Sequence, residues 1–217
     1  MAQIHADIAK AATVRARELE WVASPSPGVQ RMRIERDGDE VARLTSVVRY
    51  AAGSVFPEHT HGGGEEYLVL AGTFSDADGD HIEGTYVRNG VGTSHAPFTL
   101  GGCTILVKLR WMHESETGQH VVNAANPLVW REAPDGSEVV LWKDERETVR
   151  LVEVFEGERT IAHARGVELF VVAGDVTVNG EALSTWDWAR RPGDTSVRIA
   201  CETAARLYVK TGHLSGS

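Results

Sequence analysis

The chain has 217 residues, 42% of them hydrophobic and 24% charged, which is ordinary for a soluble globular protein of one or two domains. Its formal net charge of −9 argues against a broad surface that binds nucleic acid or an anionic membrane. With two cysteines, no secretory signal and no apolar run near the roughly 18 residues of a transmembrane helix, the sequence excludes a disulfide scaffold and predicts a cytoplasmic protein.

The first 20 residues are predicted to be an N-terminal arm. A helix within this arm is the single helical element that the apolar pattern allows. The residues that would share one face of it are Ile4, Ile8, Ala11 and Ala12. From residue 21 onward the pattern changes, so we expect no further helix.

Short apolar stretches bounded by glycine make up the rest of the chain. They are rich in β-branched and aromatic residues, and several alternate apolar with polar positions, which is typical of strands. In chain order the clearest stretches are 41–50, 66–72, 103–109, 149–155, 168–174 and 206–210. Many short strands separated by turn residues predict an all-β sandwich or barrel.

An internal repeat divides the chain. GGEEYLVLAG at 63–72 lines up with RGVELFVVAG at 165–174, an offset of 102 residues. The segment NAANP at 123–127 interrupts the strand pattern between the two copies. We therefore predict one domain over residues 21–123 and a second, similar domain over residues 124–217.

The first copy contains two histidines and an acid at fixed spacing. The pattern is G-x5-H-x-H-x3-E-x6-G, from Gly53 through His59, His61 and Glu65 to Gly72. Residues i and i+2 of a strand share a face, so the two imidazoles point together. Three glycines then form a flexible turn, and the acid opens the next strand within reach of the same pocket.

A third histidine, His95, follows in GTYVRNGVGTSHAPF at 84–98 and is expected to come from a third strand. Three imidazoles and one carboxylate that converge inside a barrel make a site for one divalent transition metal ion. Glu66, next to Glu65, should face the opposite side of its strand, so we expect it to support the site without ligating the metal.

These segments resemble the two sequence motifs of the cupin superfamily. The first motif matches at every defining position, and the second matches at Gly84, Gly92 and His95, with Gly90 and Thr99 in place of its proline and asparagine. More narrowly, the chain is similar to the cupin half of ChrR-type anti-sigma factors. The resemblance implies an all-β fold of two tandem cupin barrels of the double-stranded β-helix, jelly-roll type.

The resemblance also implies a ligand set, a metal and an oligomer. By resemblance the ligands are His59, His61, Glu65 and His95, and the metal is zinc, while iron, manganese and nickel suit the same residues. Cupins often dimerise through their sheets, so a homodimer is expected.

The second copy is predicted to lack the site. Aligned on the closing glycines, His59 becomes Ile161 and Glu65 becomes Val167, whereas His61 is retained as His163. His95 falls opposite Ser196 in this alignment. One histidine cannot hold a metal in a four-ligand pocket, so we expect a degenerate barrel with a structural or ligand-binding role.

Two functions follow from the metal site. The ChrR resemblance implies a regulatory module that senses a signal and acts in transcription or stress response. In that family a helical zinc domain binds the sigma factor. Here only about 20 residues precede the barrel, with no cysteine before Cys103, so we do not expect direct sigma-factor binding.

The alternative function is a metal-dependent dioxygenase, or an isomerase, that acts on a small diketone or enol-like substrate. Four protein ligands on iron, manganese or nickel leave up to two positions for water, oxygen or substrate. A tetrahedral zinc ion would instead be filled by the four side chains. The identity of the metal therefore bears directly on the function.

Overall fold

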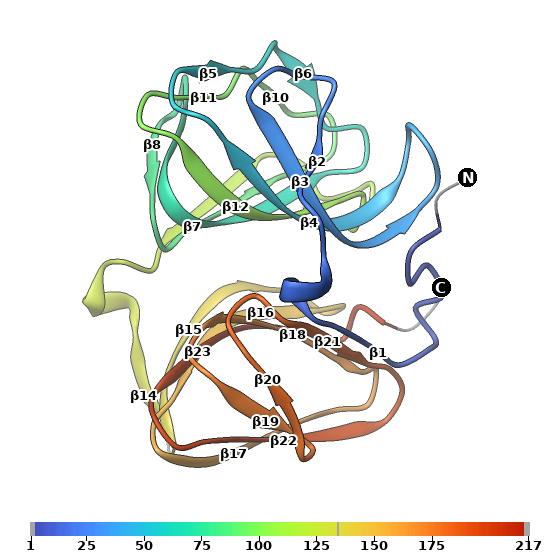
Figure 1. The fold of residues 1–217 in the computed structure, drawn as a ribbon, viewed down its shortest axis with the longest axis vertical. Coiled ribbons are helices and arrows are strands. Elements are labelled where there is room, and N and C mark those ends of the chain that lie inside the picture. The colour runs from blue at the N-terminus through green and yellow to red at the C-terminus, as the bar shows by residue number, and fades with distance from the viewer. Residues whose placement is uncertain (1–2, 134, 215–217) are drawn as a thin grey trace. The chain divides into compact units, whose positions relative to one another are not determined.

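The computed structural model describes residues 3–133 and 135–214, and almost all of its regular structure is β-strand (Figure 1). The helices of the described residues are two single 3₁₀ turns, η1 (Ala16–Glu18) and η2 (Pro127–Val129). None of the helices in this part of the chain is long and apolar enough to cross a membrane. The predicted all-β class is confirmed.

The chain forms two compact units. Unit 1 contains Leu19–Asn126 and the described residues up to Ala6, whereas unit 2 contains Asp7–Glu18 and the described residues from Pro127 onward. The boundary after Asn126 lies within the NAANP segment. The two units therefore divide the predicted N-terminal arm between them.

Unit 1 is built around one ten-stranded sheet, in which the main path of hydrogen-bonded neighbours is β13-β9-β7-β12-β4-β3-β2. A separate antiparallel pair consists of β6 and β10. The strands of unit 1 are β2 (Val22–Ala23), β3 (Val29–Asp37), β4 (Arg43–Tyr50), β5 (Ser54–Val55), β6 (His59–Thr60), β7 (Glu65–Asp76), β8 (Gly79–Ile82), β9 (Thr85–Asn89), β10 (Ser94–His95), β11 (Phe98–Thr99), β12 (Cys103–Leu109) and β13 (Gln119–Asn123).

The interior of unit 1 is partly apolar and partly polar. Apolar side chains, mostly valine and aromatic, from five of its strands form one buried cluster, which contains Val29, Val48, Tyr67, Val69, Phe74, Val87, Cys103, Ile105 and Val107. Beyond this cluster lies a second group of inward-facing residues that are histidine, glutamate and arginine. The interior of unit 1 is therefore not filled by aliphatic packing alone.

A β-bulge in β7 changes which of its residues face inward. The pairing of β7 with β12 shifts between Thr104 and Ile105, which leaves Leu70 without a partner. The alternation of faces is reset there. Glu65 and Asp76 are an odd number of residues apart, and the bulge brings both to the same face of the strand.

Unit 2 consists of a seven-stranded sheet in the order β1-β21-β18-β23-β16-β15-β14 and a four-stranded sheet in the order β17-β22-β19-β20. Its strands are β1 (Ala12–Val14), β14 (Arg131–Ala133), β15 (Gly136–Lys143), β16 (Thr148–Val154), β17 (Gly157–His163), β18 (Val167–Ala173), β19 (Val176–Val178), β20 (Glu181–Leu183), β21 (Trp188–Arg191), β22 (Thr195–Cys201) and β23 (Ala205–Thr211). All six strands predicted from the sequence, three in each unit, are confirmed.

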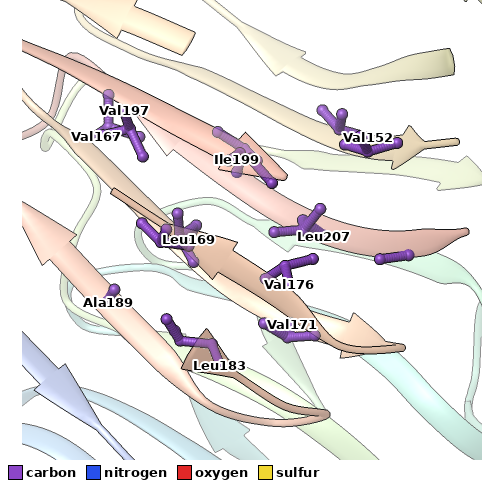
Figure 2. Packing of buried hydrophobic residues seen from close by; sticks show 14 residues of the cluster. Val152, Val167, Leu169, Val171, Val176, Leu183, Ala189, Val197, Ile199 and Leu207 are labelled. Atoms are coloured by element: carbon purple, nitrogen blue, oxygen red, sulfur yellow. The ribbon is translucent and has the colours of Figure 1, made fainter. Parts of the chain in front are cut away.

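Aliphatic side chains fill the interior of unit 2. Figure 2 shows side chains from both of its sheets gathered in one cluster, which includes Val152, Val167, Leu169, Val197 and Leu207. Each of these five side chains is at most 1% exposed. Burial of this kind contributes roughly 1.5–3 kcal/mol for each large aliphatic side chain.

The two units repeat a buried polar contact at the same offset of 102 residues. In unit 1 the hydroxyl of Tyr86 donates a hydrogen bond of 2.6 Å to the carboxylate of Glu66. In unit 2 the indole nitrogen of Trp188 donates one of 3.0 Å to Glu168. A repeat that preserves a buried contact, and not only a turn sequence, favours duplication over chance similarity.

The predicted helix in the N-terminal arm is wrong for the residues that the structure describes. Ala12–Val14 form β1, which pairs antiparallel with β21 and lies beside it in Figure 1. Ile4 bridges to Arg36 in unit 1. The open edge of β21 offers backbone hydrogen-bond partners to this segment, and such tertiary pairing overrides a helical pattern in a short stretch.

Candidate metal centre

Two short antiparallel strands position the histidines. In the pairing of β6 with β10, His59 lies directly opposite His95, and Thr60 lies opposite Ser94. His61 follows β6 immediately, and its backbone N–H donates to the carbonyl of Thr93. The prediction that His95 comes from a strand other than that of His59 is confirmed.

The glycine run between the histidines and the acid lets the chain pass close to its neighbours. A Cβ on Gly64 would lie 2.3 Å from the sulfur of Met112, and one on Gly63 would lie 2.7 Å from Cγ of Arg110. Gly64 also has a φ of 75°, in the left-handed region. This tight turn places Glu65 at the first position of β7, as predicted.

The four predicted ligands lie together. One ligand atom from each of His59, His61, Glu65 and His95 can be chosen so that all four atoms lie within 4.8 Å of one another. The Nε2 atoms of His61 and His95 lie 3.3 and 3.4 Å from the same oxygen, Oε2 of Glu65. Both Nε2 atoms are buried and have no hydrogen-bond partner among the described residues.

The other ring nitrogen of each histidine is held by an acceptor. Nδ1 of His59 donates to the carbonyl of Pro57 at 3.0 Å, and Nδ1 of His95 lies 3.0 Å from the carboxylate of Asp76. Nδ1 of His61 lies 2.9 Å from the hydroxyl of Thr93. Because that hydroxyl donates to the carbonyl of Gly90, it accepts from the imidazole.

This arrangement assigns the proton of each neutral ring to Nδ1 and leaves the lone pair on Nε2. In His61 and His95 this lone pair faces the carboxylate of Glu65. Metal-binding histidines are held in the same way, by an acceptor on the nitrogen that does not ligate. The orphaned Nε2 atoms and the donor set therefore fit a divalent transition metal ion.

The carboxylate of Glu65 is ionised in this setting. Burial by itself would raise its pKa, but contact with His61 and the neighbouring His95 and His59 outweigh burial and leave the pKa below its ordinary value. The side-chain amide nitrogen of Asn89 donates to Oε2 of Glu65 at 3.3 Å. The side-chain oxygen Oδ1 of Asn89 in turn accepts a hydrogen bond from the side-chain amide of Gln119. Glu65 is thus available as an anionic ligand in a fixed orientation.

Sequence reasoning missed Asp76, the carboxylate behind His95. Its other oxygen lies 3.6 Å from Nε2 of His81. Burial would raise the pKa of Asp76, but the contacts with His81 and His95 dominate and hold the pKa well below its usual value. The sequence does show an acid, Asp76, at the end of the strand that Glu65 begins. Strict alternation, however, would place the side chain of Asp76 on the opposite face of that strand from Glu65.

Glu66 occupies a different environment from Glu65. Its carboxylate accepts hydrogen bonds from Tyr86 at 2.6 Å and from Arg88 at 2.7 Å. Arg88 also pairs with Glu116. The role of Glu66 in supporting the site remains a prediction, and the contacts above give it a structural role in the sheet.

The ligand cluster opens into a cavity of about 350 Å³ within unit 1. Its walls include Tyr50, Phe56 and Phe74 in addition to the four predicted ligands. Burial raises the pKa of Tyr50 above its usual range, and the charge of Glu65 adds to the increase. The phenol therefore stays neutral and can donate a hydrogen bond to a molecule in the cavity.

Unit 2 has no equivalent ligand cluster in the described residues. Ile161 pairs with Val197 across β17 and β22 in the register in which His59 pairs with His95, so the alignment of His95 with Ser196 is wrong by one residue. Ile161 packs against the aliphatic cluster that contains Val197, which fills the space that the ligands occupy in unit 1.

The comparisons with known proteins agree with these features. The sequence model described as the ChrR cupin-like domain matches residues 9–113. This part of the chain belongs to the ChrR-like cupin family. No curated protein sequence matches the chain.

Solved structures of cupin proteins share its fold at low identity. A candidate dioxygenase from Nostoc punctiforme is 12% identical with a TM-score of 0.72, and the match covers 96% of this chain and 85% of the other. The pirin YhhW of Escherichia coli in complex with nickel(II) is 16% identical with a TM-score of 0.71, covering 93% and 98%. A mutant of Bacillus subtilis oxalate decarboxylase is 12% identical with a TM-score of 0.63, covering 92% and 76%. Identities this low support the fold alone.

Proposed function

We propose that this protein is a tandem cupin in which His59, His61, Glu65 and His95 hold one divalent transition metal ion for chemistry on a small molecule. The observation that carries the proposal is the orientation of the three imidazoles. Each Nδ1 faces an acceptor, and the ligand atoms of the cluster, with Glu65, lie within 4.8 Å. Such a metal would supply Lewis acidity at the end of the cavity.

The enzymatic role is favoured by the space around the cluster. A cavity of about 350 Å³ is at the lower end of the roughly 300–1,000 Å³ that ligand pockets occupy. Four protein ligands on iron, manganese or nickel leave up to two positions open toward that space. Tyr50 contributes a neutral hydrogen-bond donor on the same wall. A dioxygenase or isomerase activity on a diketone or enol-like substrate would use all three features.

The solved relatives give this reading support by analogy. One is a candidate dioxygenase, one holds nickel(II), and one is an oxalate decarboxylase. All three names describe small-molecule or metal chemistry in the same fold, although fold alone does not establish function.

A second candidate function is a metal-binding module of a regulator, and the family description favours it. In that case the bound metal would be zinc, and the four side chains would complete its coordination. A homodimer and a sensing role in transcription or stress response belong to the same proposal. The enzyme and the regulator differ in whether any coordination position is left for a substrate.

The aliphatic interior of unit 2 supports the proposal that the second barrel is structural. His163, the counterpart of His61, accepts a hydrogen bond from the backbone of Arg165 at its Nδ1. It therefore provides a matched control for substitutions in the first barrel.

The decisive experiment measures metal in the purified protein by elemental analysis. We expect one metal ion per chain in the wild type and in His163→Ala, and a loss of metal in His61→Ala and Glu65→Ala. If the wild type contains no stoichiometric metal after expression with zinc, iron, manganese or nickel, the proposal is wrong. Oxygen uptake by the iron-loaded protein with small diketones would favour the enzyme, and capture of a sigma factor would favour the regulator.

A further inference from the structure

Three arginines on one face of β3 line the cavity of unit 1. Arg31, Arg33 and Arg36 are half-buried, and their neighbours across the sheet on β4 also line the cavity. The same cavity reaches the four predicted metal ligands at its other side. The arginines and the ligand cluster therefore face one enclosed space.

A β-bulge accounts for the third arginine. Strict alternation from Arg31 and Arg33 would bring Glu35 to the cavity. The register between β3 and β4 shifts after Arg33 and leaves Ile34 unpaired, so Arg36 takes the inward position in place of the acid.

The displaced acid is used elsewhere. The carboxylate of Glu35 accepts a hydrogen bond of 2.5 Å from Thr45 and lies 3.2 Å from Nζ of Lys108. Both contacts are buried and lie on the face of the strand pair that points away from the cavity. The bulge thus places the carboxylate of Glu35 on the opposite face of β3 from the three arginines.

The positive charges of Arg31 and Arg33 are not paired at this wall. Among the described residues, neither of these arginines forms an ion pair with an acid. Arg36 donates only to the backbone carbonyl of Gly38, and its pKa is lowered by burial and then by the charges of Arg33 and Arg31. Half-buried like charges repel one another, and an anion between them would relieve that repulsion.

Two acids line the cavity, and neither pairs with these arginines. Glu65 belongs to the ligand cluster, and Glu40 is an exposed residue after the end of β3. Asp39 acts on Arg36 through its charge, but Arg31 and Arg33 have no acidic partner among the described residues, and an anionic ligand would supply one.

We propose that Arg31 and Arg33 bind the carboxylate of a small organic acid and hold its other end toward the histidine–glutamate cluster. The part of the inference that places the other end of the acid at the ligand cluster rests on the proposed metal function. A guanidinium group binds a planar carboxylate through two parallel hydrogen bonds. The aromatic walls of the cavity, Tyr50, Phe56 and Phe74, suit the carbon skeleton of an organic acid and offer nothing comparable to inorganic phosphate. The arginines thus define the substrate class as anionic.

Calorimetric titration of the metal-loaded protein tests this inference. The probes are acetate, succinate and benzoate, with succinamide as the neutral counterpart of succinate and with inorganic phosphate. We expect at least one acid to bind at millimolar concentration, more tightly than phosphate, and succinamide not to bind. Binding should weaken as salt is added, because a charge pair near the surface is screened.

The variants are Arg31→Gln, Arg33→Gln and the double variant, with Arg49→Gln as the matched control. Arg49 lies on the neighbouring strand β4, donates to Gln30 and stacks on Trp21 outside the cavity. Each cavity variant should raise the dissociation constant for the acid by about tenfold, which is the loss of affinity expected when a charge-assisted hydrogen bond is removed. Arg49→Gln should leave it unchanged.

Two readouts separate this inference from a folding defect and from the metal proposal. The cavity variants should melt at the same temperature as the wild type or higher, since each removes a repulsive charge. Acid binding that persists in metal-free His61→Ala would support the arginine site even if the metal proposal fails. The inference is overturned if no acid binds, if succinamide or phosphate binds as tightly, or if the double variant binds like the wild type.

Discussion

The carboxylate of Asp76 lies 3.0 Å from Nδ1 of His95, while Nε2 of the same imidazole faces Glu65. The ring is thus held between two acids at opposite ends of the one strand β7. Since Asp76 fixes both the position of the proton and the orientation of the ring, it should raise the affinity of His95 for a metal without binding the metal itself.

Asp76→Asn should therefore lower the metal affinity of the protein by about 10–100-fold, as the loss of such a supporting group generally does. A competition titration with a chelating dye measures this change. The matched control is Asp80→Asn, because Asp80 is an exposed acid of the same hairpin that accepts a hydrogen bond from Ser75. Equal affinities in the two variants would show that Asp76 does not support the site.

Two glycines of the first sequence motif should differ in how well they tolerate alanine. Gly53 and Gly72 have nearly the same φ, 75° and 76°, so both substitutions strain the backbone by roughly 1–2 kcal/mol. A Cβ on Gly72 would also lie 2.2 Å from the carbonyl oxygen of Gly102, whereas a Cβ on Gly53 meets nothing within 4 Å.

We expect Gly72→Ala to destabilise the protein by about 1–3 kcal/mol more than Gly53→Ala does. Urea denaturation of the two variants gives the difference directly. Similar free energies of unfolding would mean that the chain near Gly102 shifts to admit the methyl group.

Leu207→Ala tests whether the interior of unit 2 is closely packed. Leu207 is fully buried in the aliphatic cluster, so its truncation should lower the free energy of unfolding by about 2–5 kcal/mol. The metal content of the folded variant should equal that of the wild type, because the predicted ligands all lie in unit 1. A loss below about 1 kcal/mol would indicate an interior that collapses around the gap or admits water.

The thiol of Cys103 should make stability depend on alkaline pH. Burial raises its pKa to about 11, although a hydrogen bond with Thr99 acts in the opposite direction. In the unfolded chain the thiol ionises near its ordinary pKa of about 8.5. Its contribution to stability is therefore complete below that value and falls as the pH rises toward 11.

The wild type should lose on the order of 2 kcal/mol more than Cys103→Ala between pH 8 and pH 11. Denaturation of both proteins at the two pH values provides the measurement, and the variant serves as the control for every other group that titrates. Parallel losses in the two proteins would contradict a buried, protonated thiol.

The sequence was sufficient to predict the strands and to single out His59, His61, Glu65 and His95 as residues that lie together. Their role as metal ligands stays a prediction. His59 and His61 are two residues apart, and Glu65 opens the next strand after a glycine turn. The alternation of inward-facing and outward-facing side chains breaks only where a β-bulge adds a residue to a strand. Nothing in the amino-acid types around that residue marks it in the sequence. The bulges at Leu70 and Ile34 therefore concealed Asp76 and the cavity arginines.

Edge pairing was the other feature that local pattern could not supply. The counterpart of His95 is different: the offset of 102 residues between the repeats already gives Val197 in place of Ser196, and the pairing of β17 with β22 agrees with that offset. The arm residues Ala12–Val14 adopt a strand because β21 accepts them at its edge. A helical pattern contains no information about such a distant partner.

The attachment of Asp7–Glu18 to unit 2 affects how the protein can be made. The guanidinium of Arg15 pairs with Glu181, and β1 covers β21, although about 170 residues separate the partners in the chain. During synthesis this segment leaves the ribosome about 170 residues before β21 does, and it can pair only after β21 has been made. A fragment that starts at Pro127 would leave the edge of β21 uncovered and prone to strand-to-strand aggregation. Work on the second barrel alone would need residues 7–18 supplied by fusion after the C-terminus or as a separate peptide.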